Sequence, residues 1–240
     1  MLLERVVETS QRVTRTPRRL EKIELISGLL RLAEPDEIET AVAFLSGYVR
    51  QGKIGIGHGT LRNCAVAPAE AATRSIGDVE AALSEMARTE ARPRRALLEA
   101  LMARATAAEQ AFLKALLVGE IRQGALEGVM MDAVAKASGT RPERVRRAAM
   151  MAGDLSRVAH VAIEEGEAGL ARFDVEVMRP VQPMLAQTAE DAAEAIANLG
   201  RAAFEYKFDG AHPGAPRVGR SAPGGSAGSW IWSVCARSCR

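Results

Sequence analysis

The sequence predicts a mainly α-helical fold, and two observations lead to it. Hydrophobic residues make up 48% of the chain and aromatic residues only 4%, so the core must be built from Ala, Leu, Val and Met, a set that favours helices. Near the N-terminus and again after residue 75, apolar residues recur at the spacing of amphipathic helices. With 240 residues the chain has room for one large domain or two small ones.

Three helices are predicted at the N-terminus and are expected to pack on each other. Thr16-Pro17 interrupts the first apolar pattern and suits a helix start, because proline lacks the N–H that a helix interior uses. This gives helices over residues 2–14 and 17–32. Acidic residues begin a third helix at 34–36, and Gly52 is expected to end it.

A glycine-rich segment follows at residues 53–61, with the sequence Lys-Ile-Gly-Ile-Gly-His-Gly-Thr-Leu. Alternating glycines make a poor helix and an open loop that a partner's backbone can approach. Two interpretations stay open. The segment either binds phosphate, although it lacks the spacing of a dinucleotide-binding fingerprint, or is simply a turn between helices.

The helical pattern resumes at Ser75, which is predicted to cap a helix that ends near Arg88. The sequence Arg-Pro-Arg-Arg at 92–95 predicts a turn, and the next helix carries Leu98 and Leu101 on its apolar side.

Two capping boxes mark further helix starts, Thr106 with Glu109 and Thr140 with Glu143. The second box opens a helix with an arginine cluster at Arg144, Arg146 and Arg147. Such a cluster is usually a solvated face and only sometimes contacts phosphate.

The pattern changes at residues 173–180, where apolar and polar residues alternate and prolines follow, and this is the best candidate for a domain boundary. Beyond it, Thr188 is predicted to cap a short helix that Gly200 ends.

A strand is predicted over residues 202–208, with Glu205 and Lys207 on the same face. Asp209 and Gly210 follow directly. Nowhere else do a potential nucleophile, two carboxylates and a permissive glycine lie so close together next to a change in composition.

The formal net charge is +2, but residues 211–240 contain four arginines and no Asp, Glu or Lys, so the preceding body is slightly acidic. A nucleic-acid interface must then rest on local patches. No apolar run approaches the ~20 residues of a membrane span, and the N-terminus lacks the features of a secretion signal. Of the three cysteines only Cys64 lies in the body, so we expect a reducing, cytoplasmic location without membrane association.

The Lys-x-Asp-Gly sequence at 207–210, with Glu205 before it, resembles motif I of the covalent nucleotidyltransferases, which include ATP-dependent DNA ligases and capping enzymes. Other segments occur in the order seen in ATP-dependent DNA ligases: a helical N-terminal region, Lys-Ile-Gly-x-Gly at 53–57, Gly-Glu-Ile-Arg-Gln-Gly at 119–124, and an Arg-Pro…Pro-Met-Leu-Ala entry at 179–186. The chain resembles a bacterial, actinobacterial-type ligase over about residues 1–211.

The resemblance implies two parts with different tasks. Residues 1–173 would form a multi-helix DNA-binding domain, and residues 174–211 a linker and the truncated start of an α+β adenylation domain with motif I. The helical domain would bind nicked duplex DNA as a monomer, mainly through the DNA backbone. Lys53 and Arg122 match the phosphate partners, although Arg122 is alternatively a helix-end charge.

The family's reaction implies roles for the motif I residues. In that family the lysine attacks the α-phosphorus of ATP to form a lysyl-AMP, the AMP passes to the 5′-phosphate of a nick, and the 3′-hydroxyl displaces it, as DNA replication, repair and recombination require. The resemblance assigns Lys207 as the nucleophile and Glu205 to adenosine binding, with ATP and Mg²⁺ as cofactors. A free lysine has a pKa near ~10.4, so neighbouring cations must lower the pKa of Lys207. The alternative is a solvent-exposed strand lysine.

Residues 212–240 depart from the family pattern. His212 stands where the family usually has arginine, and Pro213 and Pro216 break the strand expected next. The segment holds 13 Gly, Pro or Ser and no leucine or acid, a bias that resembles a GC-rich gene read out of frame. We therefore expect a frameshifted, disordered tail and a catalytically inactive chain. Cys235 and Cys239 alone are weak evidence for a metal site, and none is assigned.

Two other functions stay open. One is a stand-alone helical DNA-binding or scaffold protein in which the motif match is accidental. The other is a helical protein-interaction domain with no nucleic-acid role. Salt-dependent binding to nicked duplex DNA would separate this last function from the others, because phosphate contacts impose a steep salt dependence.

Overall fold

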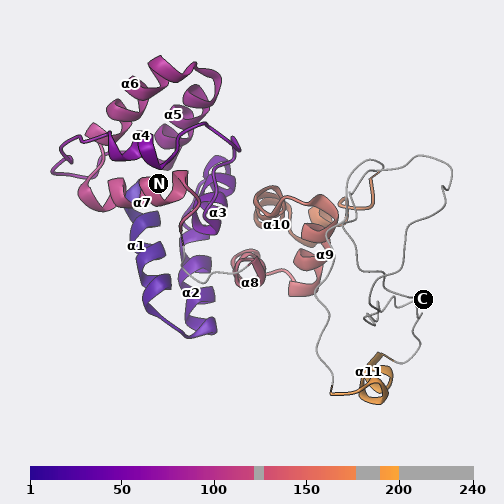
Figure 1. Ribbon diagram of the computed structural model, residues 1–240. Coiled ribbons are helices and arrows are strands. Elements are labelled where there is room, and N and C mark those ends of the chain that lie inside the picture. Colours follow the sequence, from indigo (N-terminus) through magenta and orange to yellow (C-terminus); the bar gives the residue numbers. More distant parts are fainter. Residues whose placement is uncertain (122–126, 177–189, 200–240) are drawn as a thin grey trace, which may run out of the picture. The chain divides into compact units, whose positions relative to one another are not determined.

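The computed structural model describes residues 1–121, 127–176 and 190–199 (Figure 1). The chain divides into two compact units, Met1–Asp174 and Val175–Arg240. The described residues form helices and one isolated bridge between Leu2 and Ser75, with no β-strand among them. The predicted mainly α fold class is confirmed.

In the first unit, the described helices are α1 (Leu3–Arg15), α2 (Arg19–Leu30), the short 3-10 helix η1 (Pro35–Glu37), α3 (Ile38–Ser46), α4 (His58–Arg62), α5 (Ile76–Arg88), α6 (Ala91–Ala103), α7 (Ala107–Leu117), α8 (Glu127–Ser138), α9 (Pro142–Ala152) and α10 (Leu155–Leu170).

Thr16 organises the turn between α1 and α2. Its backbone N–H bonds to the carbonyl of Arg12, and its hydroxyl donates to Glu21 at 2.6 Å and accepts from the backbone N–H of Arg18 at 3.2 Å. The predicted interruption at Thr16-Pro17 is confirmed.

The third helix is shorter than predicted. It ends at Ser46, because Gly47 adopts the left-handed conformation with φ 83° and its N–H bonds to the carbonyl of Phe44. The prediction that Gly52 ends this helix is wrong, since the earlier glycine already occupies the C-cap. The chain then forms a loop, and α4 begins at His58, inside the segment expected to be open.

The helix starts at Ser75 and Thr106 are confirmed. The Ser75 hydroxyl accepts from the N–H of Asp78 at 3.0 Å, and the Thr106 N–H donates to Glu109 at 2.8 Å, as capping boxes require. The predicted turn at 92–95 is wrong, because these residues lie within α6. Proline is tolerated in the first turn of a helix, where its missing N–H has no intrahelical partner.

The capping box predicted at Thr140 does not form. Pro142 takes the first position of α9, so Arg141 becomes the N-cap and makes no side-chain cap. The Thr140 hydroxyl instead lies 2.7 Å from that of Ser138. The helix itself forms as expected, with Val145 and Ala149 buried.

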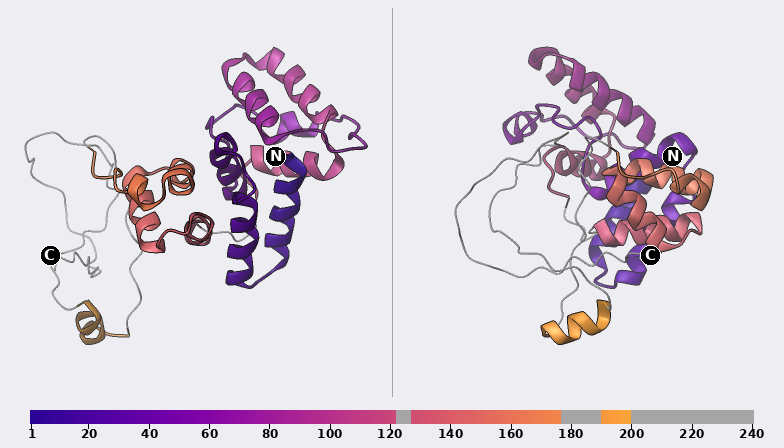
Figure 2. Two further views of the ribbon diagram at one scale, coloured as in Figure 1. Left: turned by 180° about the vertical axis from the view of Figure 1, so that it is seen from behind. Right: turned by 90° about the vertical axis from the view of Figure 1, so that its right-hand side faces the viewer.

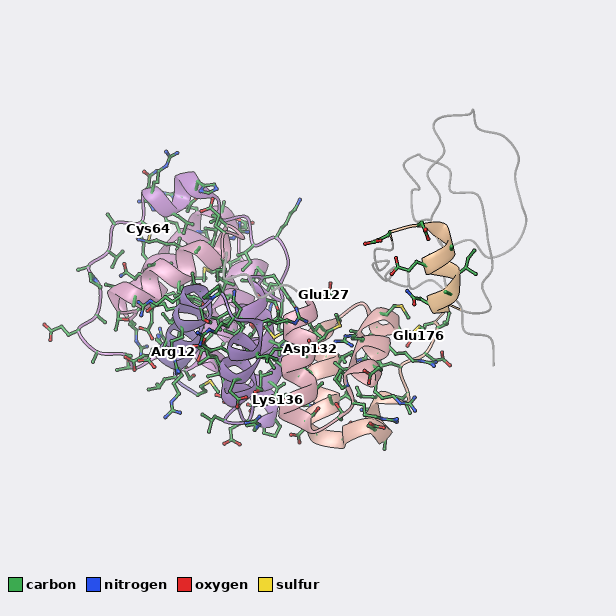
Figure 3. The ribbon with its side chains drawn as sticks, turned by 90° about the horizontal axis from the view of Figure 1, so that it is seen from below. Arg12, Cys64, Glu127, Asp132, Lys136 and Glu176 are labelled. Atoms are coloured by element: carbon green, nitrogen blue, oxygen red, sulfur yellow. The ribbon has the colours of Figure 1, made fainter. Side chains whose placement is uncertain are left out.

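Helix α8 connects several parts of the first unit. It packs against α2, α9 and α10, and α10 packs in turn against α3 (Figures 1 and 2). On its polar side, Asp132 accepts from Arg19 of α2 at 2.6 Å and from Arg146 of α9 at 2.5 Å. Figure 3 shows Asp132 and Lys136 projecting from this helix.

The core is continuous and mostly aliphatic, as the composition predicts. Its largest fully buried side chains are Phe44, Leu3, Ile26, Leu30, Ile38, Leu45, Ile76, Leu83, Met86, Leu98, Leu101 and Met102. Because these come from α1, α2, α3, α5 and α6, residues far apart in the sequence share one apolar interior.

The described part of the second unit holds α11 (Ala192–Leu199), where Asp191 accepts from the N–H of Glu194 at 2.8 Å. Thr188, its predicted cap, lies outside the described residues, as do the predicted strand at 202–208 and the tail at 212–240. In the part of the chain that is described, no helix is long and apolar enough to cross a membrane.

Candidate nucleic-acid interface

The loop between α3 and α4 presents Lys53 on the surface of the first unit. Its neighbours Ile54 and Ile56 are buried, whereas Lys53 is exposed. Gly52 and Gly55 have φ values of 69° and 78°, a conformation that other residues rarely adopt. The loop is therefore held by two isoleucine side chains while its polar side faces solvent.

Two residues at the start of this loop reach helices α3 and α5. Gln51 Nε2 donates to Glu80 Oε1 at 2.7 Å and to Ser84 Oγ at 2.9 Å. Arg50 pairs with Glu39 and lies 3.5 Å from Glu80. Burial raises the pKa of the Glu80 carboxyl, and Arg50 opposes this effect.

Arg94 of α6 closes the other end of the loop. Its Nε donates to the carbonyl of Met86 at 2.9 Å, and its guanidinium also bonds to the carbonyl of Thr89. A Cβ atom added at Gly55 would lie 2.5 Å from Arg94 Nη1. Gly55 therefore has a backbone conformation that favours glycine, and an added Cβ atom would also displace the end of the Arg94 side chain.

The segment after α7 lies beside this loop. His58 Nε2 is 3.8 Å from Glu120 Oε1, and a Cβ atom at Gly47 would contact Ile121 at 3.3 Å. Gly119 has φ 69° and turns the chain out of α7. The structure thus places the segment 119–121 against Gly47 and His58, which flank the loop that carries residues 53–57. The sequences at 53–57 and 119–124 are those for which the resemblance implies DNA contacts.

Of the four predicted site residues, only Lys53 lies in the described part of the chain. It is exposed, and no ion pair with another described residue is formed by its ammonium group. Arg122, Glu205 and Lys207 lie outside the described residues. Their assignments stay predictions.

Sequence reasoning missed the residues that hold the loop. Gln51, Glu80 and Arg94 had no assigned role, although the basic run at 92–95 was a visible signal. The proline in this run predicts a turn, whereas the packing of α6 shows that one of its arginines covers Gly55.

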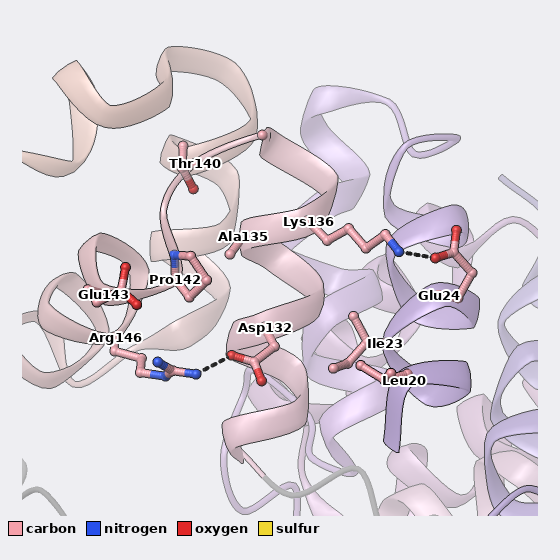
Figure 4. A pocket seen from close by; sticks show the side chains of 11 residues that line it. Leu20, Ile23, Glu24, Asp132, Ala135, Lys136, Thr140, Pro142, Glu143 and Arg146 are labelled. Carbon is pink, nitrogen blue, oxygen red and sulfur yellow. Dashed lines mark hydrogen bonds and ion pairs between the residues drawn. The ribbon is translucent and has the colours of Figure 1, made fainter. Parts of the chain in front are cut away.

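A cavity of about 640 Å³ lies among α2, α8 and α9 (Figure 4). Its walls are bridged by ion pairs, Lys136 with Glu24 and Arg146 with Asp132. These pairs join neighbouring helices, so four of the five charged side chains that line this cavity are already engaged with each other.

A smaller cavity of about 290 Å³ is lined by Arg141, Glu143, Arg144 and Arg147. Arg141 donates twice to Glu167, at 2.8 and 3.0 Å, and the guanidinium lowers the pKa of that carboxyl to about 2. Arg147 lies 3.5 Å from Asp174. The arginine cluster is thus largely matched by carboxylates, in keeping with a solvated face.

Among the described residues, no group of three or more His, Cys, Asp or Glu side chains is placed to hold a metal ion. Cys64 is buried, and burial raises the pKa of its thiol.

No protein-family model matches the chain. Curated proteins do match it. A protein from Anaeromyxobacter sp. (strain Fw109-5), named Probable DNA ligase, is 48% identical over 88% of this chain and 42% of its own length. Another of that name from Anaeromyxobacter dehalogenans (strain 2CP-1) is 50% identical over 91% of this chain and 44% of its own length. A third, from Saccharopolyspora erythraea, is 46% identical over 88% and 42%.

The chain spans less than half the length of these relatives. Identity of this extent along nearly the whole chain reflects common descent, so the resemblance noted from the motifs is confirmed. The chain is a homologue of one part of the larger proteins named probable DNA ligase, actinobacterial ones among them.

Proposed function

We propose that the chain is part of an ATP-dependent DNA ligase and that its first unit binds duplex DNA through the loop at 50–57 and the adjoining segment at 119–121. The names of its relatives support the ligase assignment. The structural observation that carries the DNA-binding proposal is that the segment 119–121 reaches Gly47 and His58, which flank the loop that exposes Lys53.

The geometry suits a sugar-phosphate backbone. Gly52 and Gly57 leave open space beside the backbone, so that a strand of DNA can come close to it there. The ammonium group of Lys53 is available to neutralise a phosphate. Contacts of this kind set the register of the protein on DNA and read no base sequence. The substrate proposed is therefore a nicked duplex of any sequence, bound by a monomer, with Arg122 as a second phosphate partner.

The catalytic part of the proposal rests on the sequence motif. We assign Lys207 as the residue that takes AMP from ATP in a Mg²⁺-dependent step and Glu205 as a contact to the adenosine. A cytoplasmic location goes with this function. Both residues lie outside the described part of the chain, so the geometry adds no support here.

DNA binding can be tested by titrating 5′-phosphorylated nicked duplex at several salt concentrations. Lys53→Ala should weaken binding and reduce the slope of log K against log[salt] by about one phosphate contact. The matched control is Lys136→Ala, because Lys136 is also an exposed lysine but is paired with Glu24 on another face. Salt-independent binding, or the same slope for Lys53→Ala as for the unmodified chain, would contradict the proposal.

Adenylation needs a separate test. We propose that this chain alone does not form lysyl-AMP, because Ala-His-Pro follows motif I where the resembling family continues with arginine. Incubation with labelled ATP and Mg²⁺ should leave Lys207 unlabelled, and robust labelling of that residue would contradict this proposal. The alternative function is a helical DNA-binding or interaction module without catalysis.

A further inference from the structure

A hydrogen-bonded network fastens the chain directly before Lys53. Gln51 Nε2 donates to Glu80 Oε1 at 2.7 Å and to Ser84 Oγ at 2.9 Å, and both acceptors belong to α5. Arg50 adds ion pairs to Glu39 and Glu80. The partners on α5 lie 29 and 33 residues from Gln51, so the network ties the loop to a distant helix.

The network is poorly suited to a purely stabilising role. Glu80 Oε2 and Gln51 Oε1 are both buried and have no hydrogen-bond partner among the described residues. Leaving buried acceptors unpaired costs free energy, and so does burying a carboxylate. Its clearest physical effect is to fix one backbone conformation at Gln51.

That conformation matters because the next residues are inherently free to rotate. Lys53 lies between Gly52 and Gly55, both with positive φ and with the conformational freedom of glycine. Downstream, Ile54 and Ile56 are buried and Arg94 covers Gly55. Upstream, the N–H of Gly52 bonds to the carbonyl of Val49 at 3.2 Å, and Gln51 is the nearest residue whose side chain is fixed. Together they limit the directions in which the Lys53 backbone can point.

We propose that Gln51 and Glu80 are positioning residues for duplex binding, holding the turn at Gly52 so that the Lys53 ammonium group meets a DNA phosphate. This inference rests on the proposed function of the loop. Neither side chain contacts DNA, and both act through Lys53. Preorganisation of this kind raises affinity by reducing the ordering required on binding.

The test is a double-mutant cycle on affinity for nicked duplex DNA. Gln51→Ala and Glu80→Ala should each weaken DNA binding by about tenfold, because a lysine that must be ordered on binding loses most of its contribution to affinity. In a Lys53→Ala background the same substitutions should have no further effect, because the residue they position is gone. Glu80→Gln keeps an acceptor for Gln51 and should bind within about twofold of the unmodified chain.

Matched controls separate positioning from loss of fold. Thermal unfolding of each variant is measured together with DNA binding. If Glu80→Ala does not fold, the comparison of Gln51→Ala with Glu80→Gln still tests the proposal. Hydrogen exchange at residues 52–57 should speed up in Gln51→Ala and stay slow in Glu80→Gln.

The outcomes distinguish this inference from the proposed function. If the unmodified chain does not bind DNA, or if Lys53→Ala binds DNA as tightly as the unmodified chain, the proposed function and the positioning role are both overturned. If binding depends on Lys53 but Gln51→Ala keeps full affinity, the positioning role alone is wrong. The positioning role would also be excluded if the losses of binding free energy from Gln51→Ala and Lys53→Ala added in the double variant, because independent sites give additive effects.

Discussion

The Glu120 carboxylate lies 3.8 Å from Nε2 of His58, and this pair links the segment after α7 to the first residue of α4. Both side chains are largely exposed, at 58% for Glu120 and 66% for His58. Ile121 belongs to the same segment and lies beside Gly47, where an added Cβ atom would meet it at 3.3 Å. A largely exposed negative charge therefore stands within the surface that we propose for DNA.

Replacing that charge should strengthen DNA binding. Glu120→Gln removes a carboxylate that repels phosphates, and we expect an affinity gain of about two- to threefold at low salt, which disappears as salt screens the repulsion. Fluorescence anisotropy with nicked duplex DNA at low and high salt measures the effect. Glu143→Gln, on α9, is the matched control and should change affinity little; equal gains for both variants would point to net charge alone.

Gly55→Ala should destabilise the first unit and disturb the loop. A Cβ atom there would lie 2.5 Å from Arg94 Nη1, and φ is 78°. We expect a loss of about 1–2 kcal/mol in the free energy of unfolding, the usual cost of a left-handed conformation for an L-residue. Urea denaturation checks this.

The control for that substitution is Gly59→Ala. Gly59 lies in α4, and a Cβ atom there meets nothing within 4 Å. Alanine is the better helix former, so stability should rise by up to ~1 kcal/mol. If Gly59→Ala were destabilised as well, neither the contact with Arg94 nor the positive φ of Gly55 would explain the loss.

The Arg141–Glu167 pair should make stability depend on pH in the acid range. The guanidinium lowers the pKa of Glu167 from 4.5 to about 2. Its contribution is therefore fully present above pH 4.5 and is lost as pH falls towards 2. Since both groups are exposed, solvent screening keeps the contribution small.

The variant Glu167→Gln isolates this effect. Its free energy of unfolding should lie below that of the unmodified chain at neutral pH, and the two should converge as pH falls through the pKa of the native carboxyl, about 2. Chemical denaturation across this pH range provides the measurement. A constant difference at every pH would mean that packing, rather than charge, accounts for the change.

Core and surface leucines should differ sharply in their sensitivity to truncation. Leu83 of α5 is fully buried, so Leu83→Ala should cost about 2–5 kcal/mol through lost burial and a cavity. Leu20 is 79% exposed, and Leu20→Ala should change stability by less than ~0.5 kcal/mol. A large loss at Leu20 would indicate that a partner or a second copy covers it in solution.

Local signals predicted the helices well where the deciding contacts are local. The caps at Ser75 and Thr106 form hydrogen bonds to residues three positions away, which a sequence pattern can capture. Two of the failures occurred where two local signals competed. Gly47 ended α3 before Gly52, and Pro142 displaced Thr140 from the start of α9.

By itself, the sequence determined the helical fold class, the caps at Ser75 and Thr106, and the likeness to DNA ligases, because composition, short-range hydrogen bonding and motif order are all properties of the linear chain. Only the tertiary structure decided that the segment after α7 reaches Gly47 and His58 on either side of the loop, that Arg94 covers Gly55, and that Gln51 is fastened to α5. These contacts join residues tens of positions apart, and they exist only because a shared apolar core packs the helices that carry them.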